Sequence, residues 1–279
     1  MIKDFNELLK LWFSEDIGEG DHSAFSCIPE EAKGKSQLII KEKGVLAGVD
    51  IAREVFKAFD PELQMTVFLQ DGTHVNPGDI AFVVAGSVRS LLQTERLMLN
   101  IMQRMSGVAT KTNAYVRMLE GTGTKVLDTR KTTPGLRMLE KMAVKIGGGV
   151  NHRFGLYDMI MLKDNHVDFA GGIENAIQSA NAYLHSKGKA LKIEIEVRNF
   201  DELNQVLETG QVDRIMLDNF SVEDTAKAVK IINGRFETES SGGITMDTLR
   251  DYAECGVDYI SVGALTHSVK GLDMSFKAV

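Results

Sequence analysis

The second half of this 279-residue chain alternates short apolar runs with longer stretches whose apolar residues fall at helical spacing. Such alternation predicts βα units, which form a parallel sheet with right-handed crossovers. So many consecutive units favour a closed or partly closed β/α barrel. The expected strands are Lys125–Leu127, Met159–Leu162, Ile193–Val197, Ile215–Leu217, Phe236–Glu237 and Tyr259–Val262. The expected helices between them are Leu136–Ile146, Ile173–Lys187, Phe200–Glu208, Val222–Asn233 and Met246–Cys255.

The first part of the chain lacks this regular alternation. It begins with apolar residues at helical spacing from Ile2 to Trp12, which predict an amphipathic helix. Strand-like and helical segments then follow, separated by Gly, Asn and Pro turns. The expected elements are strands at Ser36–Lys41, Leu63–Leu69 and Ile80–Ala85, a helix at Ile51–Phe59, and a helical region at Val88–Glu120 that is broken near Ser106-Gly107.

Charge and composition exclude several classes of protein. The net charge of −7 argues against general nucleic-acid binding, which needs a basic surface. Charges interrupt the apolar residues of the first segment, and no run approaches the roughly 18 apolar residues of a membrane span. Cys27 and Cys255 are far apart and have no metal or redox spacing, so we expect free thiols and a cytoplasmic protein.

Polar side chains follow nearly every expected strand of the second half. In a β/α barrel the carboxyl ends of the strands share one mouth, where catalysis takes place. A mouth richer in cations than in acids predicts a polyanionic ligand, and separate carboxylates that end two strands suit Mg²⁺ bound to phosphates. The cationic residues are Arg130, Lys131, His152, Arg153 and Lys163, and the two carboxylates are Glu196 and Asp218.

Two loops of the second half have the pattern of a phosphate site. Ser241-Gly242-Gly243 follows a strand and precedes a helix expected to start near Thr245, so its backbone N–H groups can face an anion. Ser261–Leu265 follows the last strand in the same way, and phosphate-binding barrels use the loops after their last two strands. Alone, each feature has a simpler reading, since a lone SGG is more often a turn and a lone Arg130 a surface cation. The combination favours a site.

Long motifs of the chain resemble the quinolinate phosphoribosyltransferase family in order and spacing. The most specific is DTRKTTPGLRMLEKMAVKIGGGVNHRFGLYDMIMLKDNH at Asp128–His166, and the resemblance covers nearly the whole chain. Departures are small: His22-Ser23 stands where Leu-Thr is commoner, and Ser240 where Ala is usual. Further matching motifs are EDIGEGD (Glu15–Asp21), ERLMLNIMQRMSGVAT (Glu95–Thr110), IEIEV (Ile193–Val197), IMLDNF (Ile215–Phe220), SSGGI (Ser240–Ile244) and YISVGALTHS (Tyr259–Ser268).

The resemblance implies an α/β fold of two domains. Residues 1–110 would form an α/β sandwich, residues 111–270 an open β/α barrel, and the tail 271–279 would pack on the sandwich. The implied reaction transfers the phosphoribosyl group of phosphoribosyl pyrophosphate, a co-substrate, to quinolinate with decarboxylation. The products would be nicotinate mononucleotide, pyrophosphate and CO₂, as in de novo NAD biosynthesis. Mg²⁺ is expected and no organic cofactor.

The resemblance also assigns roles to single residues. Arg96 would enter the active site of a neighbouring subunit, which makes a homodimer the smallest functional unit. The quinolinate carboxylates would contact Arg130, His152, Arg153 and Lys163. The ribose-phosphate chain would lie along Thr129, Lys131 and His267, the ribose and magnesium at Glu196 and Asp218, and the 5′-phosphate at Ser241, Gly242, Gly243 and Gly263. The expected catalytic residues are Lys131, Lys163, Glu196 and Asp218.

Three other functions fit parts of the pattern. A pyrophosphorylase-like protein associated with molybdate transport shares the DTRKT-type block, but differs around the segment that matches Tyr157–His166 here. A Schiff-base aldolase would use Lys163, which would have to lie in an apolar setting, although Asp164 follows it. A catalytically silent barrel would not need an intact set of charges at its mouth.

Overall fold

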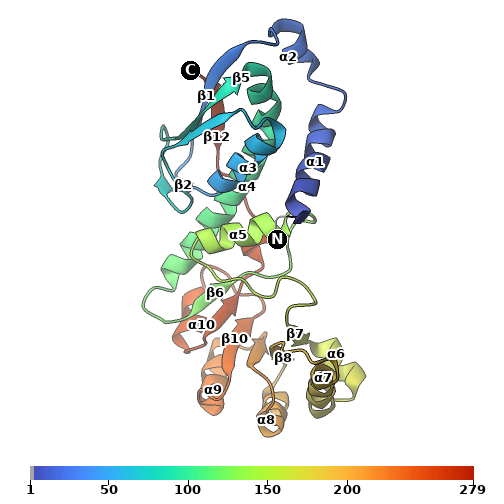
Figure 1. Cartoon of the computed structure of the whole chain (residues 1–279). Helices are drawn as coiled ribbons and strands as arrows, with labels where there is room; N and C mark the ends of the chain where they lie inside the picture. Colours follow the sequence, from blue (N-terminus) through green and yellow to red (C-terminus); the bar gives the residue numbers. More distant parts are fainter. Residues whose placement is uncertain (1–2) are drawn as a thin grey trace. The chain divides into compact units, whose positions relative to one another are not determined.

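The structure, a computed structural model, describes residues 3–279, with side chains from Phe5 onward (Figure 1). It consists of two compact units. Unit 1 contains the chain up to Lys111 together with Met138–Gly147 and Ser268–Val279, and unit 2 contains Thr112–Arg137 and Gly148–His267. One unit has an antiparallel sheet and the other a parallel one, which confirms the predicted α/β fold class. Ile2, the predicted start of the first helix, lies outside the described residues.

Unit 1 is built on a four-stranded antiparallel sheet. The strand order is β12-β1-β5-β3, with β12 at Met274–Ala278, β1 at Lys33–Ile40, β5 at Ile80–Ser87 and β3 at Gln64–Val67. The C-terminal strand pairs with β1 along five residues, from Ser36↔Ala278 to Ile40↔Met274. A separate two-stranded ribbon joins β2 (Gly44–Val45) to β4 (His74–Val75). The last residues of the chain therefore complete a sheet that starts near its beginning.

The core of unit 1 lies between this sheet and its helices. The rings of Phe56, Phe82 and Phe276 come from α3, β5 and β12 and pack within 6.4 Å of one another, centroid to centroid. Asp71 accepts a hydrogen bond from the Val49 backbone N–H at the start of α3. The helices are α1 (Lys3–Ile17), α2 (His22–Cys27), α3 (Val49–Phe59) and most of α4 (Val88–Met118) and α5 (Arg137–Ile146).

Helix α4 runs through Ser106-Gly107 without a break, so the predicted interruption is wrong. The reason is tertiary packing within unit 1. The Ser106 hydroxyl donates to the backbone oxygen of Ala47 and accepts from its N–H. A Cβ atom at Gly107 would lie 2.2 Å from the backbone oxygen of Lys270. This glycine therefore allows the backbone of the C-terminal segment to approach the helix, and does not end it.

Gly107→Ala is expected to destabilise the protein although Ala favours helices. The added methyl group would meet a backbone atom, which cannot rotate away. Overpacking of this kind costs about 1–3 kcal/mol, so we expect a melting temperature lower by about 3–10 °C. Asn100→Ala, at an exposed position of the same helix, is the matched control. If both variants melt at the wild-type temperature, the tight approach at Gly107 is contradicted.

Unit 2 is built on a six-stranded sheet in which all pairs are parallel. The order β6-β11-β10-β9-β8-β7 leaves β6 and β7 at the edges, as in an open barrel. The chain winds through neighbouring strands from β7 to β11, and β11 lies beside β6. The strands are β6 (Lys125–Leu127), β7 (Ile160–Leu162), β8 (Ile193–Val197), β9 (Arg214–Asp218), β10 (Glu237–Ser241) and β11 (Tyr259–Ser261).

Amphipathic helices cover the sheet of unit 2 and enclose its main apolar core. Ile177 of α7, Leu203 of α8 and Ala228 of α9 are fully buried against strand residues such as Ile195 and Ile215. The helices are α6 (Asp164–Ala170), α7 (Ile173–Lys187), α8 (Phe200–Thr209), α9 (Val222–Ile232), α10 (Leu249–Glu254) and α11 (Ala264–His267). Of these, α6 and α11 were not predicted from the sequence; both are short and follow strand ends directly. In residues 3–279, none of the helices has the length and apolarity needed to cross a membrane.

Candidate active site

A pocket of about 300 Å³ lies at the carboxyl ends of the parallel strands of unit 2. Met161 of β7 and Met216 of β9 give it an apolar side, and both are buried. The other lining residues are polar and mostly follow or end strands. The full lining is Thr129, Arg130, Lys131, His152, Arg153, Met161, Lys163, Met216, Glu239, Ser241 and Ser261. The pocket thus combines several cations with an apolar side, which suits a flat anionic ligand.

The loop after β6 places the first cations. The Thr129 hydroxyl accepts a hydrogen bond from the Lys131 N–H, and the Thr266 hydroxyl donates to the Lys131 backbone oxygen at 2.9 Å. Arg137 ties this loop to the next, because its guanidinium donates to the Thr132 hydroxyl and to the backbone oxygen of Phe154. Backbone and hydroxyl groups therefore fix the loop, while the side chains of Arg130 and Lys131 stay exposed.

Arg153 lines the pocket and is partly buried, unlike Arg130 and Lys131. Its guanidinium donates to the backbone oxygen of Met159 at 3.3 Å. Burial, followed by the charge of Arg130, lowers the pKa of Arg153, while the charges of Glu194 and Asp158 oppose this effect. Two cations held against each other in this way are suited to an anionic ligand, which would relieve their repulsion.

Lys163 forms an ion pair with Glu196 across the mouth. Its Nζ lies 2.9 Å from Oε2 of Glu196, and the lysine side chain is 45% exposed whereas the glutamate is 7% exposed. The lysine directly follows β7, and the glutamate is in the neighbouring strand β8. An exposed ammonium paired with a carboxylate is not the apolar setting that a Schiff-base lysine requires. The geometry therefore disfavours the aldolase hypothesis.

Asp218 lies at the end of β9, next to the glycine loop that follows β10. The Asn219 amide donates to the Asp218 carboxylate at 2.7 Å, and the Asn219 backbone N–H donates to the backbone oxygen of Ser241. Gly242 has a φ of +98°, and a Cβ there would lie 2.2 Å from Oδ1 of Asn219. Ser221 caps α9 by accepting from the Asp224 N–H, so Asp218 is not needed as a cap. Asn219 thus connects the carboxylate to the loop.

The glycine loop does not lead into a helix at Thr245 as predicted. Helix α10 begins only at Leu249 and has six residues, with Thr248 at its N-cap position. Residues 246–248 form a turn, and the Thr245 N–H donates to the Thr248 hydroxyl. Any anion at this loop would therefore be held by the backbone of the loop and not by a helix start next to it.

Gly263, in the loop after β11, lies beside Lys131 and His267. A Cβ at Gly263 would lie 3.0 Å from Cδ of Lys131 and 3.2 Å from Nε2 of His267. The absence of a side chain at Gly263 thus leaves room for both neighbours. Lys131, which the sequence places after the first strand of the barrel, therefore lies beside the loop after the last one, because β6 and β11 are adjacent.

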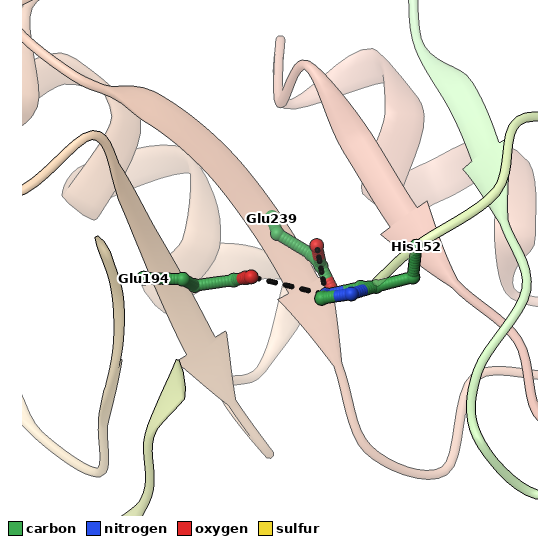
Figure 2. A group of neighbouring side chains, drawn as sticks. All are labelled: His152, Glu194 and Glu239. Atoms are coloured by element: carbon green, nitrogen blue, oxygen red, sulfur yellow. Dashed lines mark ion pairs between the residues drawn. The ribbon is translucent and has the colours of Figure 1, made fainter. Parts of the chain in front are cut away.

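His152 lies at the inner side of the pocket and faces two buried carboxylates (Figure 2). Its Nε2 is 3.0 Å from Glu194 of β8 and 3.5 Å from Glu239 of β10. On the other side of the ring, Nδ1 accepts a hydrogen bond from the Arg153 N–H, and the His152 N–H donates to Asp128. Both glutamate side chains are 0% exposed, so the three groups interact away from solvent.

The charges of this buried group depend on one another. Burial lowers the pKa of His152, but hydrogen bonds and charge from Glu194 and Glu239 outweigh this and raise the pKa to about 9. Burial also raises the pKa of Glu239, yet His152 and Arg214 outweigh it and bring it below its usual value. The acceptor contact at Nδ1 of His152 favours the neutral ring, but two carboxylates interact more strongly than one backbone N–H. The ring therefore carries a positive charge.

The sequence matches both domains of one enzyme family. Residues 21–106 match the quinolinate phosphoribosyl transferase N-terminal domain, and residues 108–277 match the C-terminal domain of the same family. The chain belongs to the quinolinate phosphoribosyltransferase family. The family assigned from the motifs around Asp128–His166 is thus confirmed. Phosphoribosyl pyrophosphate is the co-substrate that this family uses.

Individual members agree with this assignment. The chain is 45% identical to the chloroplastic nicotinate-nucleotide pyrophosphorylase (carboxylating) of Oryza sativa subsp. japonica, over 98% of this chain and 77% of the relative. It is 42% identical to quinolinate phosphoribosyltransferase (decarboxylating) 1b of Nicotiana tabacum, over 98% and 82%. The crystal structure of NadC from Streptococcus pyogenes superposes with a TM-score of 0.94 at 41% identity, covering 100% of this chain and 98% of that one.

Most of the site residues predicted from the family motifs lie together in unit 2. Seven line the pocket, namely Thr129, Arg130, Lys131, His152, Arg153, Lys163 and Ser241. Glu196, Gly242 and Gly263 adjoin a pocket residue in space or in sequence. Gly243 follows Gly242, His267 lies beside Gly263, and Asp218 is linked to the pocket through Asn219. Arg96 is an exposed residue of α4 in unit 1 and does not line this pocket.

Sequence analysis missed the buried part of the site. Met161, Met216 and Glu239 line the pocket, and Glu194 lies behind it, but none of these was predicted as a site residue. Ser261 also lines the pocket, and it belongs to the loop Ser261–Leu265 that was predicted to bind phosphate. One signal for Glu194 was available. The strand motif IEIEV has acids at alternate positions, and these point to one face of a strand whose five residues are all buried.

Proposed function

We propose that this chain transfers the phosphoribosyl group of phosphoribosyl pyrophosphate to quinolinate and decarboxylates the adduct, giving nicotinate mononucleotide, pyrophosphate and CO₂. The observation that carries the proposal is the pocket at the strand ends, in a member of this enzyme family. Quinolinate is a flat ring with two carboxylates. Arg130, Arg153 and Lys163 supply cations for the carboxylates, and Met161 and Met216 supply apolar contact for the ring.

The charge of the substrates explains why an acidic protein has a cationic pocket. Both substrates are polyanions, and two unit charges at ~4 Å repel by about 4 kcal/mol at an effective dielectric constant of ~20. Several such pairs would prevent the substrates from binding together. A lining of four side-chain cations, with His152 as a fifth charge, offsets this repulsion. The protein as a whole carries a net charge of −7, so these cations are concentrated locally.

We further propose that Glu196 and Asp218 hold Mg²⁺ together with substrate oxygens and water. The donor set fits, because Mg²⁺ bound to phosphates uses one or two protein carboxylates. The two carboxylates lie at the ends of neighbouring strands, β8 and β9. When bound, the ion would neutralise charge on the pyrophosphate. Glu196 is paired with Lys163 in this state, so a substrate carboxylate that attracts the lysine would also release the glutamate.

The reaction begins as the ring nitrogen attacks the anomeric carbon of the ribose and pyrophosphate leaves. Positive charge develops on the sugar and negative charge on the leaving group, so fixed charges of both signs stabilise the transition state. Glu196 and Asp218 face the sugar in our proposal, whereas Lys131 and Lys163 face anionic groups. The pyridinium nitrogen that forms stabilises the electron pair left on the neighbouring ring carbon as its carboxylate leaves as CO₂, and a proton from water then binds to that carbon. This step needs no organic cofactor and no covalent bond to the protein.

The phosphate loop gives a test with a matched control. Gly242→Ala would place a methyl group against Asn219 at a φ of +98°, whereas Gly243→Ala, at a φ of +61°, would meet no atom within 4 Å. Both variants carry backbone strain of about 1–2 kcal/mol, but only the first displaces the loop. We expect Gly242→Ala to raise the KM for phosphoribosyl pyrophosphate about ten-fold or more, and Gly243→Ala by about three-fold at most. Equal effects in steady-state kinetics would argue against loop placement as the cause.

A homodimer in which Arg96 completes the neighbouring subunit's site is also proposed, on the family resemblance and on the exposed position of Arg96 in α4. Arginine suits this role because its planar fork binds carboxylates and phosphates through paired hydrogen bonds. Sedimentation at the concentration of the enzyme assay tests the assembly. A monomer with full activity would contradict it.

Calorimetric titration tests the proposed substrate. Quinolinate has one carboxylate more than nicotinate, so it gains one charge-assisted contact in the pocket, worth about 1.5–3 kcal/mol. We therefore expect quinolinate to bind about 10- to 150-fold more tightly than nicotinate. Phosphoribosyl pyrophosphate with Mg²⁺ is included in a second series, in case the sugar substrate must bind first. Equal affinity for the two acids in both series would contradict the proposed substrate.

A further inference from the structure

Beneath the pocket, unit 2 contains a chain of buried charges that the proposed reaction does not use. The central strand β9 carries Arg214. Its two neighbours carry the acids, Glu194 on β8 and Glu239 on β10. Nη1 of Arg214 lies 3.0 Å from Oε2 of Glu239, and the same oxygen lies 3.5 Å from His152. The Arg214 guanidinium also packs 4.0 Å from the ring centroid of Tyr259. Figure 2 shows both carboxylates directed at one edge of the His152 ring.

Stability alone does not explain these groups. Buried ion pairs are often no more stable than apolar side chains of the same volume, because desolvation costs several kcal/mol per ion. Within the part of the chain that the structure describes, both oxygens of Glu194 and one of Glu239 are buried without a well-aligned hydrogen bond, although Oε2 of Glu194 lies 3.0 Å from His152. An arrangement that costs stability is expected where it fixes a functional group.

His152 and Glu239 both connect this buried group to the pocket, since both belong to its lining. Glu194 also acts on Arg153, the residue that follows His152, because the charge of Glu194 favours the charged form of Arg153. The two carboxylates thus lie on the inner side of two of the cations proposed to bind quinolinate. They attract these cations inward and oppose the mutual repulsion of Arg130 and Arg153.

We propose that Glu194 and Glu239 are positioning residues for the acid-binding side of the pocket: they orient the His152 ring, balance its charge, and keep Arg153 in place before the substrate binds. Arg214 has the supporting role of orienting Glu239. The proposal rests on the function proposed above, because it takes the pocket to bind quinolinate.

A metal ion bound by His152, Glu194 and Glu239 is the alternative explanation for this group. The three donor atoms lie within 4.8 Å of one another, as in a His-Glu-Glu ligand set. The two carboxyl groups already face two cations, however, the His152 imidazolium and the Arg214 guanidinium. Burial, followed by the charge of Glu239, raises the pKa of Glu194 to about 7. Oε2 of Glu239, the oxygen nearest His152, is also an acceptor for Arg214. The arrangement therefore favours an ion-pair network, and metal content is made an outcome of the test.

The kinetic test compares the same substitution at three buried acids of unit 2. Glu194→Gln and Glu239→Gln keep the shape and remove the charge. Glu202→Gln is the control, since Glu202 of α8 is buried, pairs with Arg198 and does not line the pocket. We expect the first two variants to raise the KM for quinolinate about ten-fold or more, with kcat and the KM for phosphoribosyl pyrophosphate changed less than about two-fold. The control should match the wild type in all three constants.

A second measurement requires neither turnover nor a substrate. In substrate-free protein labelled with ¹⁵N-histidine, we expect the pKa of His152 to fall by about 1 unit or more in Glu194→Gln and to stay unchanged in Glu202→Gln. If wild-type protein has no activity on quinolinate but His152 responds in this way, the proposed function fails and the positioning role survives. Positioning is overturned if Glu194→Gln leaves both the quinolinate KM and the His152 spectrum at wild-type values. It is also overturned if the purified protein holds one equivalent of a metal that Glu194→Gln removes.

Discussion

Arg130→Ala is expected to lower kcat/KM for quinolinate about 10- to 150-fold while leaving the protein folded. A charge-assisted hydrogen bond contributes about 1.5–3 kcal/mol, and each 1.4 kcal/mol is a factor of ten. Arg130 is exposed and follows β6, so its side chain supports no core. Its removal also takes one of the cations from the pocket lining, which increases the repulsion between the bound anions.

A matched control separates this local effect from a loss of overall charge. Lys230→Ala removes one positive charge from an exposed position in the last turn of α9, which does not line the pocket. We expect it to be indistinguishable from the wild type in both kinetics and thermal melting. Near-wild-type kinetics in Arg130→Ala would remove this residue from the substrate site, and a lower melting temperature would point to a structural role instead.

Lys163→Met is expected to have the largest effect, a loss of about 10²–10³ in kcat. In our account Lys163 leaves Glu196 for a substrate anion, so the substitution removes a fixed cation and leaves the nearly buried Glu196 without its partner. Because the lysine is 45% exposed, the ion pair itself contributes only about 0–1 kcal/mol to folding. The kinetic and stability effects should therefore separate clearly.

Lys163→Arg is the informative companion, because it keeps the charge but changes its shape and reach. We expect it to recover part of the lost kcat. Single-turnover kinetics with saturating substrates, together with a melting curve for each variant, measure both properties. A Lys163→Met protein that turns over at the wild-type rate would show that the Lys163–Glu196 pair takes no part in the reaction.

The fold was largely predictable because periodic burial dominates it. The predicted strand Lys125–Leu127 and helix Ile173–Lys187 have the observed bounds, since apolar residues alone define where each is buried. Local signals failed where tertiary contacts decide the outcome. Gly107 has the sequence character of a helix break, but its function is to admit the backbone of Lys270 beside the helix.

The exposed part of the candidate site was predictable for a related reason. Charged residues that follow apolar strands must lie at the mouth of a barrel, and Arg130 and Lys163 do so. Its buried part was not predicted, because Glu194 and Glu239 lie within strands and single acids there give little indication of a partner. Only the fold shows that they meet His152, which comes from a loop about 40 residues before Glu194.

The most direct test of the central claim is a single incubation of the purified protein with quinolinate, phosphoribosyl pyrophosphate and Mg²⁺. Nicotinate mononucleotide is followed by chromatography and CO₂ by release from carboxyl-labelled quinolinate, with nicotinate as the parallel substrate. We predict that nucleotide and CO₂ appear in equal amounts from quinolinate, and that nicotinate gives no product. Absence of nucleotide from folded protein, or equal turnover of nicotinate, would contradict the assignment of this pocket to quinolinate.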